Sequence, residues 1–128
     1  MARILVSSGA PWEATVGYSR AVRTGNIVEV AGTTAVDGPA IVAEGHAYGQ
    51  ARYILDKIAH ALQQVGAELR HVTRTRMYVT SCYIVDDVLK AHGEVFRDVR
   101  PVATLVVVSA LVDPRLLVEI EATAVIDD

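Results

Sequence analysis

Residues 116–126, LLVEIEATAVI, set two carboxylates into an otherwise apolar run near the end of the chain. Because side chains alternate along a strand, one face of this stretch is wholly apolar. That face carries Leu116, Val118, Ile120, Ala122, Ala124 and Ile126. The opposite face carries Glu119, Glu121 and Thr123 among apolar neighbours. The stretch therefore predicts a closing strand with one core face and one face of mixed polarity.

Five earlier segments have the composition of strands. They are expected over residues 2–8, 19–24, 26–32, 71–80 and 103–110. Gly25-Asn26 predicts a tight hairpin turn between the second and third of these strands, and VDGPA at 36–40 predicts another turn. The segment GAPWEATVG after the first strand is rich in turn-forming residues and is expected to be a loop.

Two segments have helical periodicity. Between Glu44 and Val65, apolar residues recur at steps of three and four, which predicts an amphipathic helix of about six turns. Residues 85–96, VDDVLKAHGEVF, predict a second helix with Asp86 or Asp87 as its N-cap. The order β-β-β-α-β-α-β-β indicates one α+β domain over residues 1–128, a mixed or antiparallel sheet with two helices on one face.

Composition supports a single globular domain and argues against a disordered or membrane-spanning chain. A chain of 128 residues can bury roughly two-thirds of its unfolded surface, and 52% hydrophobic residues argue against disorder. The longest apolar stretch, residues 105–112, is far shorter than the ~18–20 residues that cross a bilayer. One cysteine and no evident signal peptide fit a reducing, cytoplasmic location. The net charge of -3 makes membranes and nucleic acids unexpected partners.

The segment LVVV at 105–108 is apolar on both faces, so both faces of its strand require cover. Two helices cover one side of a sheet, and no segment remains for the other side. A bare apolar patch of that size favours association. We therefore expect a homo-oligomer that associates through the open sheet face. The apolar pattern does not indicate the symmetry of the assembly.

Patterns typical of metal or cofactor sites are absent from the sequence. The four histidines lack the spacings of metal ligands, and there is neither GxGxxG nor GxxxxGK. Cys82 follows a strand without a recognisable histidine partner and is interpreted as an inert thiol. We therefore expect no metal and no cofactor.

Arg70, Arg74 and Arg76 share one parity, which we interpret as charges that protect a sheet edge. RNA binding would require aromatic residues among them, and only Tyr78 has the right parity. For the acids of the closing strand two interpretations stay open: a solvated face, or a carboxylate in a subunit cleft. In a cleft, desolvation would raise the carboxyl pKa and suit it to proton transfer.

Several stretches together resemble the YjgF/RidA (Rid) family of small proteins. They are VGYSRAV (16–22), GNIVEVAGTT (25–34), QARYILDKI (50–58), GAELRHVTRTRMYVT (66–80), AHGEVF (91–96), RPVATLVVV (100–108) and LVDPRLLVEIEATAV (111–125). The resemblance covers nearly the whole chain in order, and the C-terminal RPVAT and LVEIEA segments are its most specific part. The chain is identified as a member of this family.

The resemblance implies a chorismate-mutase-like fold and a homotrimer, in which three sheets form a central β-barrel with the helices outside. It also implies clefts between subunits that bind small ligands, often carboxylates. Members of the RidA type hydrolyse 2-imino or enamine acids, such as 2-iminobutanoate and 2-iminopropanoate, to 2-oxo acids and ammonia.

Residue by residue, the resemblance implies that Glu119 is the catalytic acid that orients or activates water. Tyr18 matches the tyrosine that lines the pocket, and Ala31 and Gly32 match a strand that offers backbone groups. The role of Glu121 is not implied by the match.

One expected residue is missing. Ala103 stands where RidA-type members carry the arginine that clamps the substrate carboxylate, and alanine cannot make a bidentate contact. Arg100 and Thr104, in the same RPVAT motif, complete the expected substrate-binding set. Arg100, Arg20 or Arg23 could replace the clamp, and their spacing does not select one.

Three functions follow in order of preference. The first is a RidA-like hydrolase of small imines or enamines. The second is a non-catalytic ligand-binding or regulatory trimer, which the missing arginine favours. The third is a ribonuclease or translation inhibitor of the endoribonuclease L-PSP type, against which the acidic net charge argues.

Overall fold

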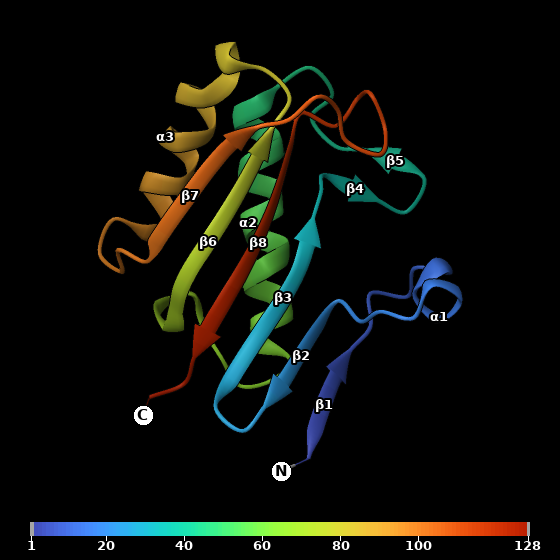
Figure 1. Cartoon of the computed structure of the whole chain (residues 1–128), viewed down its shortest axis with the longest axis vertical. Helices are drawn as coiled ribbons and strands as arrows, with labels where there is room; N and C mark the ends of the chain where they lie inside the picture. The colour runs from blue at the N-terminus through green and yellow to red at the C-terminus, as the bar shows by residue number, and fades with distance from the viewer. Residues whose placement is uncertain (1, 128) are drawn as a thin grey trace.

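The computed structural model, which describes residues 2–127, contains a six-stranded sheet with the order β1-β2-β3-β8-β6-β7 (Figure 1). The strands are β1 (Arg3–Val6), β2 (Ala21–Thr24), β3 (Ile27–Thr33), β6 (Val72–Val79), β7 (Val102–Val107) and β8 (Val118–Val125). The short strands β4 (Val36–Asp37) and β5 (Ala40–Ile41) form a separate hairpin. Neighbouring strands in the main sheet are antiparallel, except that β6 and β7 run parallel.

Two long helices cover one face of this sheet. The helices are α1 (Trp12–Val16), α2 (Ala47–Gln63) and α3 (Val85–Phe96), with 3-10 turns η1 (Leu69–His71) and η2 (Cys82–Ile84) on either side of β6. In Figure 1, α2 and α3 lie behind the sheet, and α1 lies beside β1 and β2. The face turned to the viewer carries no helix within residues 2–127. The expected α+β architecture, with two helices on one face, is confirmed for the single chain.

Strand β8 lies at the centre of the sheet and of the core. Its residues Val118, Ile120, Ala122 and Ala124 are buried, whereas Glu119, Glu121, Thr123 and Val125 are only partly buried. The alternation expected from the sequence is therefore confirmed. Helix α2 packs across β8 and β3, and its fully buried residues Ile54, Leu55, Ile58 and Leu62 fill the space between the two layers.

Helix α2 begins later than the periodicity predicts. Ala43 and Gly45 have φ of 53° and 80°, a left-handed backbone that cannot continue into an α-helix. The helix therefore starts at Ala47 instead of Glu44. It stops at Gln63, shortly before Gly66, whose φ of 82° favours glycine.

Two local predictions about helices were wrong. Helix α3 spans the expected 85–96, but Ile84 occupies the N-cap. Asp86 and Asp87 lie in the first turn, where their negative charges interact favourably with the positive end of the helix dipole. The segment expected as a loop contains α1. This five-residue helix is too short to give a periodic signal, and Glu13 stabilises it by accepting hydrogen bonds from the Ser7 hydroxyl (2.9 Å) and the Ser8 amide (3.1 Å).

The prediction of a charged sheet edge was also wrong. Strand β6 lies between β8 and β7, and the edges are β1 and β7. Thr75, Met77 and Val79 are buried beneath the helices, so Arg74 and Arg76 lie on the open face of the sheet. Strand order is a long-range property, which local charge patterning does not report.

No helix within residues 2–127 is both long and apolar enough to cross a membrane.

Candidate functional site

An irregularity in β3 places Gly32 against Glu119. Val30 pairs with Ala122 and Thr33 with Ile120, so β3 contains one residue more than β8 over this interval. Bulges of this kind redirect side chains and are common near functional sites. A Cβ atom on Gly32 would overlap Glu119 Oε2 and lie 3.1 Å from Glu119 Cδ. The site therefore needs glycine at position 32, because a side chain there would displace the carboxylate.

The carboxylate of Glu119 is half-buried and lies on the open face of the sheet. Burial raises its pKa above the ordinary value of 4.5, the positive charge of Arg20 opposes this, and the charge of Glu121 adds to it. Within residues 2–127 no hydrogen bond engages this carboxylate. Glu119 therefore has a raised pKa and carboxylate oxygens that no described residue engages.

Glu121, two residues further on the same face, is held by its neighbours. The Tyr78 hydroxyl donates a hydrogen bond to its Oε1, and Arg76 Nη1 lies 3.7 Å from its Oε2. The hydrogen bond to Glu121 is the main reason why the pKa of Tyr78 is raised. The two acids thus differ: Glu121 belongs to a polar network across β6 and β8, and Glu119 does not.

Arg20 lies beside Gly32 and Glu119. Its Nη2 donates a hydrogen bond to the Gly32 carbonyl oxygen at 2.6 Å. Its backbone is fixed on both sides, since its amide donates to Val6 O (2.8 Å) and its carbonyl accepts from the Ala31 amide (3.0 Å). Its Nε is buried without a hydrogen-bond partner among the described residues. The sequence offered Arg20 only as one of three arginines, and its place next to Glu119 depends on the pairing of β2, β3 and β8.

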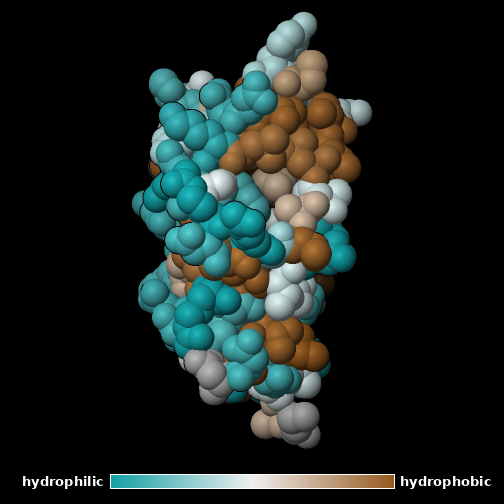
Figure 2. Space-filling model, turned by 90° about the vertical axis from the view of Figure 1, so that its left-hand side faces the viewer, coloured by the Kyte–Doolittle hydropathy of each residue, from teal (hydrophilic) through white to brown (hydrophobic). Residues whose placement is uncertain are grey.

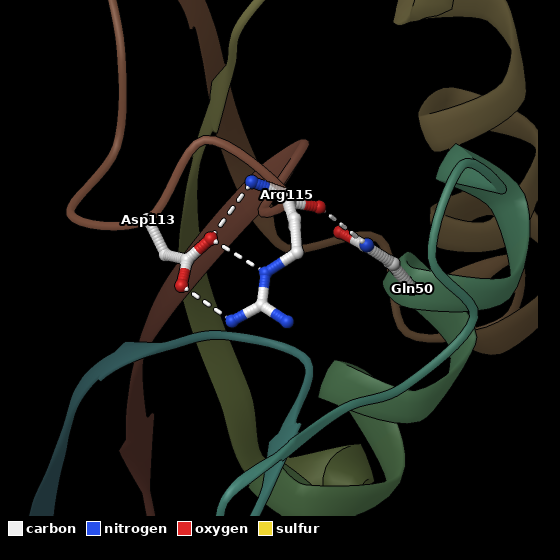
Figure 3. A network of polar contacts seen from close by, with 3 residues as sticks. All are labelled: Gln50, Asp113 and Arg115. Atoms are coloured by element: carbon white, nitrogen blue, oxygen red, sulfur yellow. Dashed lines mark hydrogen bonds and ion pairs between the residues drawn. The ribbon is translucent and has the colours of Figure 1, made fainter.

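A buried glutamine holds the segment that leads into β8, and Figure 3 shows its hydrogen bond to Arg115. Gln50 on α2 is fully buried, and its Nε2 donates to the Arg115 carbonyl oxygen at 3.0 Å. Its Oε1 accepts from the Leu117 amide at 2.9 Å, two residues before Glu119. Arg115 in turn pairs with Asp113 (Nη2 to Oδ2, 2.8 Å), and these hydrogen bonds lower the pKa of Asp113 to about 2. Gln50 was missed by the sequence analysis, because its role depends on a contact between distant segments.

The remaining expected residues divide into two groups. Ala31 adjoins Gly32 in the bulge, and Tyr18, partly buried, follows α1 with its amide donating to Glu13 O at 3.0 Å. Ala103 and Thr104 lie on the exposed edge strand β7, separated from β8 by β6. Arg100 is exposed at the start of β7, where its Nε donates to Arg97 O at 3.2 Å. A single chain therefore gathers Ala31, Gly32 and Glu119, and keeps the RPVAT residues apart from them.

Two surface depressions lie near the opposite end of the sheet. They have volumes of 370 Å³ and 500 Å³, and Arg100 and Pro101 line both. Glu119 and Gly32 line neither of them. The second depression is lined by the start of β6 and the end of β8. Glu119, in contrast, pairs with Tyr78 near the end of β6. The Glu119 site is thus separate from both depressions.

Metal-ligating side chains are not clustered among the described residues. Within residues 2–127, no group of three or more His, Cys, Asp or Glu side chains is arranged to hold an ion. Cys82 is exposed in η2. His92 on α3 lies 2.8 Å (Nε2) from the Thr75 hydroxyl, and burial lowers its pKa below 6.5.

Comparisons with known proteins agree along nearly the whole chain. The family model described as Endoribonuclease L-PSP matches residues 8–126. An uncharacterized protein of Streptomyces coelicolor is 42% identical over 119 residues, which cover 93% of this chain and 89% of that protein. The 3-aminoacrylate deaminase RutC of Acinetobacter baylyi is 30% identical over 122 residues, covering 94% and 95%.

A solved structure is similar over the same extent. It is a member of the highly conserved YjgF/YER057c/UK114 family from Mycobacterium tuberculosis, with a TM-score of 0.86 and 47% sequence identity. The match covers 98% of this chain and 100% of that one.

Proposed function

The chain belongs to the YjgF/RidA family, and we propose that it is a deaminase-like hydrolase of small imines or enamines. One observation carries the proposal: the half-buried Glu119 carboxylate lies on Gly32 with a raised pKa and no hydrogen-bond partner within residues 2–127. The similarity to RutC, a deaminase of 3-aminoacrylate, supports it. 3-Aminoacrylate is an enamine, and its tautomer is an imine that water can attack.

In the proposed reaction, Glu119 removes a proton from a water molecule as the water oxygen attacks the carbon of the C=N bond. Glu119 passes this proton to the nitrogen, which gives a neutral carbinolamine. Glu119 then takes the proton of the carbinolamine hydroxyl and delivers it to the nitrogen, so that the C–N bond breaks and ammonia leaves as the C=O bond forms. The sum is imine plus water giving a carbonyl compound plus ammonia. A carboxylate pKa raised towards neutrality favours both proton transfers.

The proposed assembly is a homotrimer whose open sheet faces form a central barrel. The open face carries exposed apolar residues on strands that are far apart in the sheet, among them Leu5, Ile27, Val102 and Val106, which are between 42% and 60% exposed. Apolar surface is also prominent on the side where α3 and β7 lie (Figure 2). A second subunit would bury this surface and would bring a β7 edge, with Ala103 and Thr104, towards the Glu119 site of its neighbour.

The test uses imines generated in the assay from amino acids by an amino-acid oxidase. We expect wild type to accelerate ammonia release above the buffer rate and Glu119→Gln to abolish the acceleration. Glu121→Gln is the matched control, because it removes a carboxylate from the same face of the same strand, and it should retain most activity. Equal rates for wild type, Glu119→Gln and buffer would refute the hydrolase.

The second candidate is a ligand-binding trimer without turnover, and the observation that favours it is Ala103 in place of the clamping arginine. A 2-oxo acid that raises the melting temperature of the protein while no imine is hydrolysed would support this function. RNA is a weaker candidate for the ligand: the net charge is -3, and Arg76 already lies in an ion pair with Glu121.

A further inference from the structure

Two other cations, Lys57 near Arg20 and the clamp candidate Arg23, already use their donors. Lys57 Nζ donates to the carbonyl oxygens of Thr34 (3.3 Å) and Val36 (2.9 Å). Arg23 donates to the carbonyl oxygens of Gly25 (2.8 Å) and Val65. These two side chains stabilise loops, since their donors are satisfied by backbone carbonyl groups.

Arg20 differs from both. A guanidinium has five N–H donors, and within residues 2–127 the guanidinium of Arg20 makes one hydrogen bond, from Nη2 to the Gly32 carbonyl oxygen. Its Nε is buried without a partner within residues 2–127. A buried donor without an acceptor is costly, and an anionic ligand that reached this group would supply the acceptor.

Arg20 and Glu119 also share one neighbour. Arg20 contacts the carbonyl oxygen of Gly32, and the Glu119 carboxylate lies where a Cβ of Gly32 would be. The positive charge of Arg20 lowers the pKa of Glu119, although no ion pair within 4.0 Å joins these two described residues. A guanidinium and a carboxylate are thus held side by side across one residue, without neutralising each other by direct contact.

We propose that Arg20 binds the carboxylate of the substrate and takes the place of the arginine that is missing at position 103. This inference rests on the proposed function of the Glu119 site. The two Nη groups at the end of an arginine match a carboxylate in two parallel hydrogen bonds, and Nη1 of Arg20 has no hydrogen-bond partner within residues 2–127. Because only Gly32 separates Arg20 from Glu119, the substrate is a short acid whose C=N carbon lies one or two bonds from its carboxylate. The anion-binding group and the proton-transfer group then belong to the same subunit.

The direct test measures binding without turnover. The probes are 2-oxobutanoate and its neutral amide, titrated by NMR into wild type, Arg20→Gln and Arg20→Lys. We expect wild type to prefer the acid, and Arg20→Gln to bind the acid about tenfold to a hundredfold more weakly, with the amide unchanged. Arg20→Lys, which keeps the charge but loses the planar fork, should lie between them. Arg97→Gln removes an exposed arginine remote from Glu119 and serves as the control.

Unchanged binding of the acid by Arg20→Gln, or equal binding of acid and amide by wild type, would overturn the proposal. Should Arg20→Gln not fold, as judged by circular dichroism, the comparison of Arg20→Lys with wild type decides in the same way. In the imine assay, Arg20→Gln should raise KM for 2-imino acids far more than it lowers kcat. Hydrolysis that does not depend on Arg20 would refute this inference alone. Arg20-dependent binding without any hydrolysis would refute the hydrolase alone.

Discussion

Gly32 leaves room for the Glu119 carboxylate, and a substitution at position 32 separates stability from activity. We expect Gly32→Ala to fold with only a small loss of stability, because its Cβ would meet the flexible end of the Glu119 side chain and not backbone. The displaced carboxylate should lower imine hydrolysis about tenfold or more, since catalytic groups tolerate little misplacement. Steady-state kinetics and chemical denaturation measure the two effects.

Gly93→Ala is the matched control for this substitution. Gly93 lies within α3, and a Cβ there would have no heavy atom within 4 Å, so alanine should raise helix stability by up to about 1 kcal/mol and leave activity unchanged. An active Gly32→Ala variant would show that the position of the Glu119 carboxylate does not matter for the reaction.

The raised pKa of Glu119 predicts the pH dependence of both activity and stability. The base form is required, so kcat/KM should fall as the pH decreases through a value above the ordinary 4.5. The folded protein binds the Glu119 proton more tightly than the unfolded chain does. This contribution to stability is therefore greatest at acid pH and is lost as the pH rises through the folded pKa.

Glu119→Gln should consequently have a melting temperature equal to or above that of wild type at pH 7, and lose this advantage below pH ~4.5. Thermal unfolding across pH measures it. A melting temperature of Glu119→Gln well below that of wild type at pH 7 would mean that the charged Glu119 carboxylate stabilises the fold. That result would contradict a carboxylate whose pKa is raised by burial.

At the scale of elements, Gln50 joins α2 to the segment that leads into β8. Replacing the fully buried Gln50 by alanine would leave the Arg115 carbonyl and the Leu117 amide without this partner. We expect Gln50→Ala to lower the free energy of unfolding by about 2–4 kcal/mol, measured by urea denaturation. Gln63→Ala, at an exposed position of the same helix, should change it by less than about 0.5 kcal/mol. Equal effects would contradict the role of Gln50.

At the scale of the whole molecule, the open sheet face predicts the oligomer. Light scattering should give the mass of three chains of 13.8 kDa each. Val106→Asp places a charge on the open face beside Tyr78 and should yield smaller species. Leu89→Asp, an exposed apolar position on α3, is the control and should remain trimeric. A wild-type monomer would contradict the proposed assembly and the subunit cleft with it.

Much of this protein is determined by its sequence alone. The alternation in 116–126 specifies which side of β8 is core, since neighbouring side chains of a strand point to opposite faces. The period of 85–96 specifies α3 to the residue. The family motifs match Glu119 and Gly32 to site positions of the family, because the order of segments matches throughout the chain.

Tertiary structure alone decided the rest, because it depends on contacts between residues far apart in the chain. The central place of β6, the bulge at Ala31 and Gly32, and the approach of Arg20 to Glu119 all follow from how β2, β3, β6 and β8 pair. The two acids of the VEIEA segment look alike by periodicity. They differ in the fold because Tyr78 and Arg76 hold Glu121, whereas Gly32 leaves space for Glu119.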